Sequence, residues 1–346
     1  MNKKGLDKLV EEGWLISQVH PSLDLEIYNY SQKTQYEKMW NEETLSSRGL
    51  VLNSEGNIVA RPFKKFFNLS EVEDKIPDLP FEAFEKMDGS LGIFFWYNEI
   101  PIFSSRGSFT SDQAKYGWEI LKKMDYESLD KSRTYLFEII YPENRIVIDY
   151  KDDEKIVLLG AIETLSGKEI RYSILEKELE GKGFELVKKW DNKKSLSELK
   201  EENDIDREGY VIRFVDGFRI KVKFEEYCRL HRIITNVSNI DIWEKLRDNL
   251  PMDEILDKVP DEFYEWVRFT EESLREKFQD VLEECEKIIY SIKNELGDSD
   301  RKDYAERIKR ERNSGILFNL LDGIDPSKTI WRLVRPSWSK PFKENK

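Results

Sequence analysis

The sequence predicts an α+β protein with two domains. An amino-terminal domain built on antiparallel or mixed sheets is expected over residues 1–235, and an all-α domain over residues 236–346. Up to residue 227, short apolar or aromatic runs alternate with turn signals, which is typical of strands. From residue 228 onward the pattern has helical periodicity, few turn signals and many opposite charges four residues apart.

The strands of the first domain are expected in four runs. In chain order these are GLVLNSEGNIVARPF at 49–63, LGIFFWYNEIPIF at 91–103, TYLFEIIYP at 134–142 and KIVLLGAIE at 155–163. Within them, NSEGN at 53–57 and YNEIP at 97–101 are typical of hairpin turns. A helix capped by Ser111 or Asp112 is expected at 110–124, and another at 172–183, ending at Gly181 or Gly183.

The helices of the second domain are expected at 240–250, 261–297 and 301–313. Charge is distributed unevenly along this domain. Residues 241–300 hold 8 basic and 19 acidic side chains, whereas residues 301–346 hold 12 basic and 6 acidic ones. The end of the chain is therefore locally basic.

Composition excludes several classes of protein. The chain has 39% hydrophobic and 36% charged residues, no apolar run of about 18 residues and no apolar signal core at its start, so we expect a cytoplasmic protein with no membrane partner. Cys228 and Cys285 lack CxxC spacing, which favours reduced core thiols over a zinc site. With only His20 and His231, catalysis is expected to use Lys, Arg, Asp and Glu. The net charge of −13 disfavours indiscriminate nucleic-acid binding but permits a local basic site.

A candidate nucleophile lies in EKMDGSLG, where Lys86 precedes an Asp88–Gly89 turn. A protonated lysine is a poor nucleophile and needs desolvation or neighbouring cations to lower its pKa. In RIKVKF, Lys221 and Lys223 would share one face of a strand while the apolar residues between and beside them are buried. Such a pair could bind phosphate oxygens and lower the pKa of Lys86. The alternative is an ordinary half-exposed strand.

Two carboxylates occur in apolar surroundings. Glu138 lies within YLFEIIYP, and Glu208 opens EGYVIRF. A buried acid is costly unless it meets a cation, and a metal-bound phosphate could supply one. The alternatives are an ion pair between Glu138 and Arg145, and a solvated strand end for Glu208.

The order and spacing of these elements resemble a known superfamily. KMDGS (86–90), FEII (137–140), EGYVIR (208–213) and KVK (221–223) are similar to the ordered motifs of the covalent nucleotidyltransferases, the superfamily of ATP-dependent polynucleotide ligases and mRNA capping enzymes. The flanking text resembles the bacteriophage tRNA-repair type of RNA ligase, the RNA ligase 1-like family, in SSRGLVLN (46–53), ARPFKKFFNLSE (60–71), SSRGS (104–108) and EEYCRLHR (225–232). The resemblance covers about residues 40–235.

The resemblance implies a nucleotidyltransferase (adenylation) domain followed by a helical domain instead of an OB-fold. It also implies a three-step reaction. Lys86 attacks the α-phosphate of ATP and forms a lysyl-adenylate; the adenylate moves to an RNA 5′-phosphate; an RNA 3′-hydroxyl then displaces AMP.

The resemblance also implies roles for side chains. Lys221 and Lys223 would contact the α-phosphate. Asp88 and Gly89 would aim Lys86. The nucleotide-binding set that it implies is Arg48, Lys65, Phe67, Lys86, Asp88, Gly89, Arg106, Glu138, Glu208, Lys221 and Lys223.

Several of these roles have alternatives. Arg48, Lys65 and Arg106 would hold the remaining phosphates or the ribose, or are surface cations. Phe67 would pack against the nucleotide, or is a core aromatic.

The metal site implied by the resemblance is a hydrated Mg²⁺ or Mn²⁺ ion. Glu138 and Glu208 would position it through its waters, or would instead hold the ribose hydroxyls. Tyr227 would reach the same waters, or is structural.

The expected partner is RNA with 3′-hydroxyl and 5′-phosphate ends, such as a nicked tRNA. The sequence lacks GxxxxGK[ST], so a separate end-healing kinase or phosphatase is expected. RKDYAERIKRER (301–312) and RLVRPSWSKPFK (332–343) offer cations and aromatics that suit RNA, or form a solvated helix and a docked tail. Rival interpretations are a non-catalytic RNA-binding or pseudoenzyme scaffold, a DNA ligase and a capping enzyme.

Overall fold

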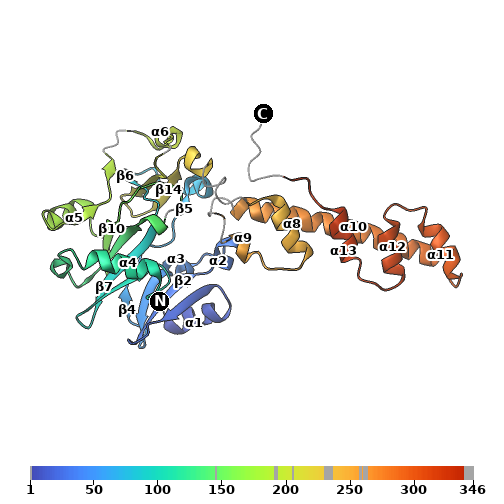
Figure 1. The fold of residues 1–346 in the computed structure, drawn as a ribbon, viewed down its shortest axis with the longest axis horizontal. Helices are drawn as coiled ribbons and strands as arrows, with labels where there is room; N and C mark the ends of the chain where they lie inside the picture. The colour runs from blue at the N-terminus through green and yellow to red at the C-terminus, as the bar shows by residue number, and fades with distance from the viewer. Residues whose placement is uncertain are drawn as a thin grey trace. The chain divides into compact units, whose positions relative to one another are not determined.

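The computed structural model describes residues 2–144, 146–190, 194–204, 206–229, 237–256, 259 and 264–338 (Figure 1). The chain forms two compact units, residues 1–234 and residues 235–346. The first combines strands and helices, and the described part of the second consists of helices and their connections. The α+β class expected from the sequence is confirmed.

The described part of the first unit contains three sheets. Its strands are β1 (Leu15–Val19), β2 (Leu25–Tyr30), β3 (Arg48–Asn53), β4 (Ile58–Ala60), β5 (Phe67–Asn68), β6 (Phe81–Glu85), β7 (Ser90–Tyr97), β8 (Ile100–Ser105), β9 (Arg133–Ile140), β10 (Lys155–Glu163), β11 (Glu185–Leu186), β12 (Lys189–Trp190), β13 (Gly209–Phe214) and β14 (Arg219–Lys223). All four strand runs expected from the sequence contain strands at these positions.

We name the sheets by their place. The amino-terminal sheet has the order β1-β2-β3-β4, the central sheet β11-β10-β9-β7-β8, and the lysine sheet β12-β6-β13-β14-β5. β10 with β11 and β14 with β5 pair in parallel, and the other described pairs are antiparallel. This agrees with the expected antiparallel or mixed sheets.

Both expected hairpin turns are present. Asn98 and Glu99 join β7 to β8 with φ of 49° and 64°, the left-handed backbone that two-residue hairpins favour. Gly56 has φ of 86° between β3 and β4.

The helices of the first unit are short. They are α1 (Lys3–Glu11), α2 (Gln32–Tyr36), α3 (Glu42–Ser46), α4 (Asp112–Leu121), α5 (Tyr172–Leu179) and α6 (Leu196–Glu201), and residues 225–229 are also helical. Ser111 caps α4, since its side chain accepts a hydrogen bond from the backbone N–H of Ala114 at 3.2 Å. α5 ends just before Gly181 and Gly183, as expected.

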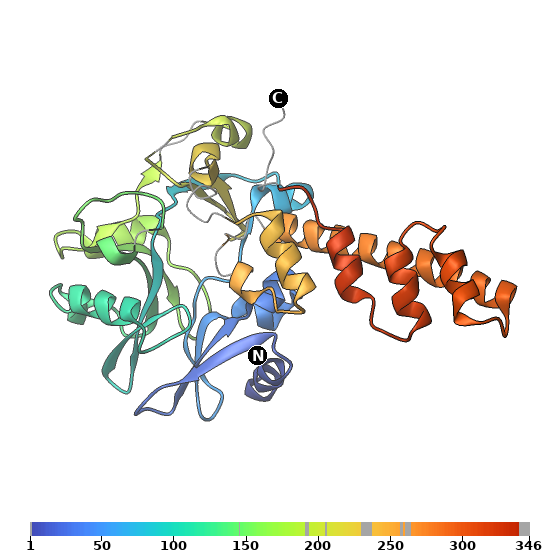
Figure 2. The same cartoon turned by 45° about the vertical axis from the view of Figure 1, so that its right-hand side comes forward.

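The sheets and short helices of the first unit are seen from a second side in Figure 2. Apolar faces hold these sheets together. One face of the central sheet packs against α4 and α5. Its other face packs against the amino-terminal sheet. The lysine sheet buries the side of β13 and β14 that carries Tyr210, Ile212 and Ile220. The opposite side of these two strands carries the charged residues Arg213, Arg219, Lys221 and Lys223.

The second unit contains α8 (Asn239–Arg247), α9 (Asp253–Leu256), α10 (Tyr264–Leu296), α11 (Arg301–Ile308), α12 (Ser314–Leu321) and α13 (Ser327–Leu333). Cys285 of α10 lies in its core. The Nε1–H of Trp243 donates to the carbonyl of Trp331 at 2.9 Å, and the Nδ2–H of Asn239 donates to that of Ser337 at 2.7 Å. These bonds dock α13 and the chain that follows it onto α8. None of the described helices is long and apolar enough to cross a membrane.

Candidate active site

Lys86 lies in the connection from β6 to β7, where the chain passes from the lysine sheet to the central sheet. Its backbone N–H donates to the carbonyl of Gly209 at 3.0 Å, which extends the pairing of β6 with β13. Its side chain is 19% exposed, and its Nζ donates to Oε2 of Glu208 at 2.8 Å. Lys86 is therefore not a free surface charge.

Glu208 bridges two lysines. Its side chain is 3% exposed, and its Oε1 lies 3.1 Å from Nζ of Lys223. Gly209, the next residue, allows the chain beside Glu208 to pack closely against β14. It has φ of 144°, and a Cβ on Gly209 would lie 2.0 Å from the carbonyl oxygen of Val222. A solvated strand end, the alternative for Glu208, is wrong.

Lys221 and Lys223 share one face of β14, as the alternation of the sequence predicts. Ile220 and Val222 between and beside them are buried. Lys221 is half-buried and pairs in register with Asn68 of β5. The structure thus brings Lys86, Glu208 and Lys223 together, with Lys221 one step along the same face.

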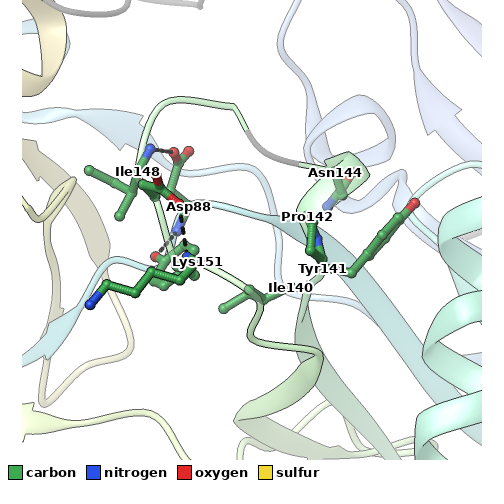
Figure 3. Close-up of a pocket in the computed structure, with 9 residues that line it drawn as sticks. Asp88, Ile140, Tyr141, Pro142, Asn144, Ile148 and Lys151 are labelled. Carbon is green, nitrogen blue, oxygen red and sulfur yellow. Dashed lines mark hydrogen bonds between the residues drawn. The ribbon is translucent and has the colours of Figure 1, made fainter.

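Asp88 is an anchor for the turn that carries Lys86. Its Oδ2 accepts from the backbone N–H groups of Val147 and Ile148, each at 2.8 Å, and its Oδ1 accepts from the hydroxyl of Tyr227 at 2.8 Å. Figure 3 shows the N–H of Ile148 directed at this carboxylate. The hydroxyl of Tyr150 accepts from the backbone N–H of Asp88 at 3.0 Å. In this structure Tyr227 therefore serves the turn.

Gly89 brings the turn close to Glu138. The N–H of Gly89 donates to Oε1 of Glu138 at 3.0 Å, and a Cβ on Gly89 would lie 2.5 Å from the carbonyl oxygen of Ile139. Burial raises the pKa of Glu138 to about 7, and the charge of Glu208 adds to the rise while Lys86 and Arg48 oppose it. Arg145, the alternative partner of Glu138, lies outside the described residues.

Arg48 opens β3 and is half-buried, with its guanidinium 5.7 Å from the ring of Phe66. Burial lowers the pKa of Arg48, and the neighbouring charge of Arg106 adds to this. Arg106 is exposed and lies 5.5 Å from the ring of Tyr30. Arg48 therefore lies within electrostatic range of both Arg106 and Glu138.

Lys65 lies in an aromatic cage. It is 7% exposed, and its Nζ lies 5.5 to 5.7 Å from the ring centres of Tyr30, Trp40 and Phe67. A surface cation, the alternative for Lys65, is wrong. Phe67 is half-buried and also packs edge-on against Trp40, so it contributes to the cage as a core aromatic would. Its contact with a nucleotide stays a prediction.

A family model described as RNA ligase matches residues 46–228, which is 183 of the 346 residues. The chain belongs to the RNA ligase family. This match spans every candidate site residue, from Arg48 to Tyr227. The family inferred from the sequence is confirmed.

Two relatives support the assignment of this RNA ligase family member. A predicted RNA ligase of Thermovibrio ammonificans is 30% identical over 210 residues, which cover 56% of this chain and 54% of that protein. An RNA ligase of Rhodothermus phage RM378 is 23% identical over 388 aligned positions, which cover 87% of this chain and 85% of the phage protein. The match thus spans about half the length of the Thermovibrio protein.

Solved structures show a related fold. A predicted ATP-dependent DNA ligase of Aquifex aeolicus aligns over 94% of this chain and 88% of its own, with a TM-score of 0.51 and 15% identity. An RNA ligase of Naegleria gruberi with pyrophosphate aligns over 49% of this chain and 57% of its own, with a TM-score of 0.42 and 15% identity. The first shows a shared fold, and the second is too distant to support any argument.

Several residues of the site in this RNA ligase family member could not be predicted from the sequence. Tyr30 and Trp40 of the cage and Tyr150 beside Asp88 were not singled out. A cavity of about 140 Å³ also lies beside the turn (Figure 3), lined by Asp88, Ile140, Tyr141, Pro142, Asn144, Ile148, Asp149, Tyr150 and Lys151. The sequence signal for this cavity is the apolar run IVIDY at 146–150. This run follows β9 but does not itself form a strand.

The carboxylates suit a hydrated metal ion better than a directly ligated one. Glu138 and Glu208 are close enough for the charge of Glu208 to raise the pKa of Glu138. Among the described residues, no group of three or more His, Cys, Asp or Glu side chains could hold a metal. Two carboxylates alone fit an ion such as Mg²⁺, which keeps most of its waters.

Proposed function

We propose that this protein is an ATP-dependent RNA ligase that joins RNA 3′-hydroxyl and 5′-phosphate ends through an adenylate on Lys86. One observation carries the proposal: a buried carboxylate, Glu208, holds Lys86 and Lys223 side by side. A nucleophilic lysine needs this setting, because its amine must be placed beside a cation that attracts the phosphate under attack. Family membership supplies the reaction class.

The first step is displacement at the α-phosphate of ATP. A bond forms between Nζ of Lys86 and the phosphorus, and the bond from that phosphorus to the bridging oxygen breaks, so that pyrophosphate leaves with the electron pair. Lys86 must lose a proton, and Oε2 of Glu208 at 2.8 Å is placed to accept it. Lys223 and Lys221 would stabilise the charge that develops on the phosphate oxygens.

The other predicted residues would bind and orient the nucleotide. Glu138 and Glu208 would hold a hydrated Mg²⁺ or Mn²⁺ ion, which supplies positive charge beside the phosphates. Arg48, which feels the charges of Arg106 and Glu138, would bind the outer phosphates together with Arg106. Asp88 would act through the turn, by fixing where Lys86 points.

The later steps concern RNA. The adenylate would pass to an RNA 5′-phosphate, and a 3′-hydroxyl would displace AMP. A nicked tRNA is the substrate we favour, with a separate kinase or phosphatase preparing its ends in the cytoplasm. Residues 1–235 would then be the adenylation domain and residues 236–346 the domain that selects RNA.

The rival functions are less well supported. A capping enzyme, or a DNA ligase of the OB-fold type, would carry an OB-fold, which is built from strands. The described residues 237–256, 259 and 264–338 form helices and connections without a strand. A pseudoenzyme would have lost a motif residue, whereas Lys86, Glu208 and Lys223 are present and in contact.

A sealing assay tests the proposal. The full chain is incubated with ATP, Mg²⁺ and a tRNA cleaved in its anticodon loop that carries a 3′-hydroxyl and a 5′-phosphate. We expect sealed tRNA from the native chain and none from Lys86→Ala. Sealing by Lys86→Ala, or no sealing of this tRNA or of a single-stranded RNA by the native chain, would refute the proposal.

A further inference from the structure

Four charged side chains form a group that has no role in the reaction proposed above. Glu169 accepts from NH1 of Arg213 at 2.6 Å and, through both carboxylate oxygens, from NH2 of Arg219 at 2.8 and 2.9 Å. Glu82 accepts from NH2 of Arg213 at 2.5 Å. We call these four residues the clasp.

The clasp connects two sheets. Arg213 and Arg219 belong to the lysine sheet, and Arg219 shares its face of β14 with Lys221 and Lys223. Glu169 comes from the other side, because it forms a bridge with Ile162 at the end of β10 in the central sheet. The ion pairs of Glu169 therefore run from the central sheet to the face of the lysine sheet that carries the candidate active site.

The clasp lies away from the places where the chain itself joins these sheets. The chain crosses between them at residues 86–89, from β6 to β7, and at residues 187–188, from β11 to β12. Both crossings adjoin Glu85, whose N–H donates to the carbonyl of Lys188 at 2.9 Å. Glu82 lies three residues away along β6, about 10 Å at the rise of a strand. The covalent crossings hold one end of this contact, and the clasp holds the other.

The surroundings of the clasp are tightly packed. The guanidinium of Arg219 lies 4.2 Å from the ring centre of Phe63, and the side chain of Arg219 is 12% exposed. A Cβ on Gly160 of β10 would lie 2.9 Å from Cζ of Phe63. A loss of Glu169 would leave two largely buried guanidinium groups with one carboxylate, and the cost of unpaired buried charge favours separation of the sheets.

We propose that the clasp sets the spacing between the lysine sheet, which carries Glu208 and Lys223, and the central sheet, which carries Glu138. Glu169, Arg213 and Arg219 are thus positioning residues for lysyl-adenylate formation. The inference rests on the proposed function, because both sheets must meet one nucleotide for Lys86 to react. A fixed spacing matters because small displacements of reacting groups slow a reaction greatly.

The chain offers a matched control. Arg133 of β9 pairs with Glu178 of α5 through NH1 at 2.6 Å and NH2 at 3.4 Å. Arg133 and Arg213 have the same exposed fraction, 15%. The control pair joins the central sheet to the helix that covers it and does not reach the lysine sheet. Glu178→Ala removes one carboxylate from one largely buried arginine, whereas Glu169→Ala removes one carboxylate that two such arginines share.

The test uses the full chain at a temperature where both variants are folded, with Glu169→Gln as a milder variant. Single-turnover formation of lysyl-adenylate is measured against ATP concentration. We expect Glu169→Ala to lower the rate at saturating ATP at least tenfold and Glu178→Ala to leave it within twofold of the native chain. Because Glu169 and Arg219 act through one contact, Glu169→Ala with Arg219→Ala should be no slower than the slower single variant.

Hydrogen exchange gives a readout that needs no catalysis. Amides in β6 and β10 should exchange at least tenfold faster in Glu169→Ala than in Glu178→Ala. If exchange in these strands is equal in the two variants, or if their adenylation rates are equal, the clasp has no positioning role. If the native chain forms no adenylate, the proposed function is wrong. The hydrogen-exchange comparison alone then shows whether the clasp holds the two sheets together.

Discussion

At the scale of single residues, the site depends on where a few carboxylates find their partners. Glu208 is buried between two lysines, whereas Asp88 receives two backbone N–H groups and one hydroxyl. Glu138 receives one N–H and keeps a raised pKa. These three acids therefore have different tasks, which follow from the groups that surround each carboxylate.

Glu138→Gln tests the raised pKa of Glu138. Between pH 4.5 and about 7 the folded protein binds more protons at Glu138 than the unfolded chain, so this group lowers stability as the pH rises through that window. The amide removes this loss. We expect the variant to match the native chain at pH 5 and to exceed it at pH 8 by about 1 to 3 kcal/mol, in denaturant unfolding without nucleotide or metal. Equal stability at pH 8 would show that Glu138 is not buried as a charged group.

Tyr227→Phe tests whether this hydroxyl serves the turn or a metal ion. Removing the hydroxyl takes one hydrogen bond from the buried Asp88 carboxylate, which should lower the free energy of unfolding by about 2 kcal/mol. Lysyl-adenylate formation should slow because the Lys86 turn loosens. The variant should have the same dependence on Mg²⁺ concentration as the native chain. Recovery of the native rate at high Mg²⁺ would instead assign Tyr227 to the metal.

At the scale of elements, β14 shows which structural features can be predicted from the sequence alone. The alternation in RIKVKF predicts both the strand and the shared face of Lys221 and Lys223, because side chains of a strand point to alternate sides. The partners of Asp88 could not be predicted in this way. They lie 59, 60 and 139 residues away, and no local pattern specifies such contacts.

The same contrast applies to the other elements. The motif residues Lys86, Glu138 and Glu208 could be found because their order resembles a family. The cage around Lys65 and the clasp could not, because each needs strands or loops from separate parts of the sequence to meet. Local periodicity determines an element, whereas the site depends on the packing of several.

Lys223→Met tests the role of the lysine face. Methionine keeps much of the apolar stem and removes the charge that would stabilise the α-phosphate in the transition state. We expect lysyl-adenylate formation to fall by a factor of about 100 to 1,000, and ATP affinity, measured by equilibrium binding, to fall less than about tenfold. Glu208 also loses a partner, so thermal unfolding serves as the control. Native rates in a folded variant would exclude Lys223 from the site.

At the scale of the whole molecule, we expect the two compact units to have different functions. All the motif residues lie in residues 1–234. In the second unit, residues 241–300 are strongly acidic and would repel RNA, whereas residues 301–346 are basic and carry aromatic side chains that suit RNA. We therefore expect residues 301–346 to be the part of this unit that contacts RNA.

A chain that ends at residue 234 tests this division. It should keep self-adenylation and seal a tRNA broken in its anticodon loop at least tenfold more slowly than the full chain. Circular dichroism and thermal unfolding must first show that the shortened chain is folded, since removal of a neighbouring unit can expose apolar surface. If the folded truncation seals the tRNA and a generic single-stranded RNA as well as the full chain does, the second unit has no role in substrate choice.

The central claim is that Lys86 becomes covalently adenylated, and intact-mass measurement tests it most directly. The full chain is incubated with ATP and Mg²⁺, its mass is measured, and the modified residue is mapped by peptide sequencing. We expect the added mass of one AMP, located on Lys86 and absent from Lys86→Ala. An unchanged mass in the native chain, or an adenylate that persists in Lys86→Ala, would contradict it.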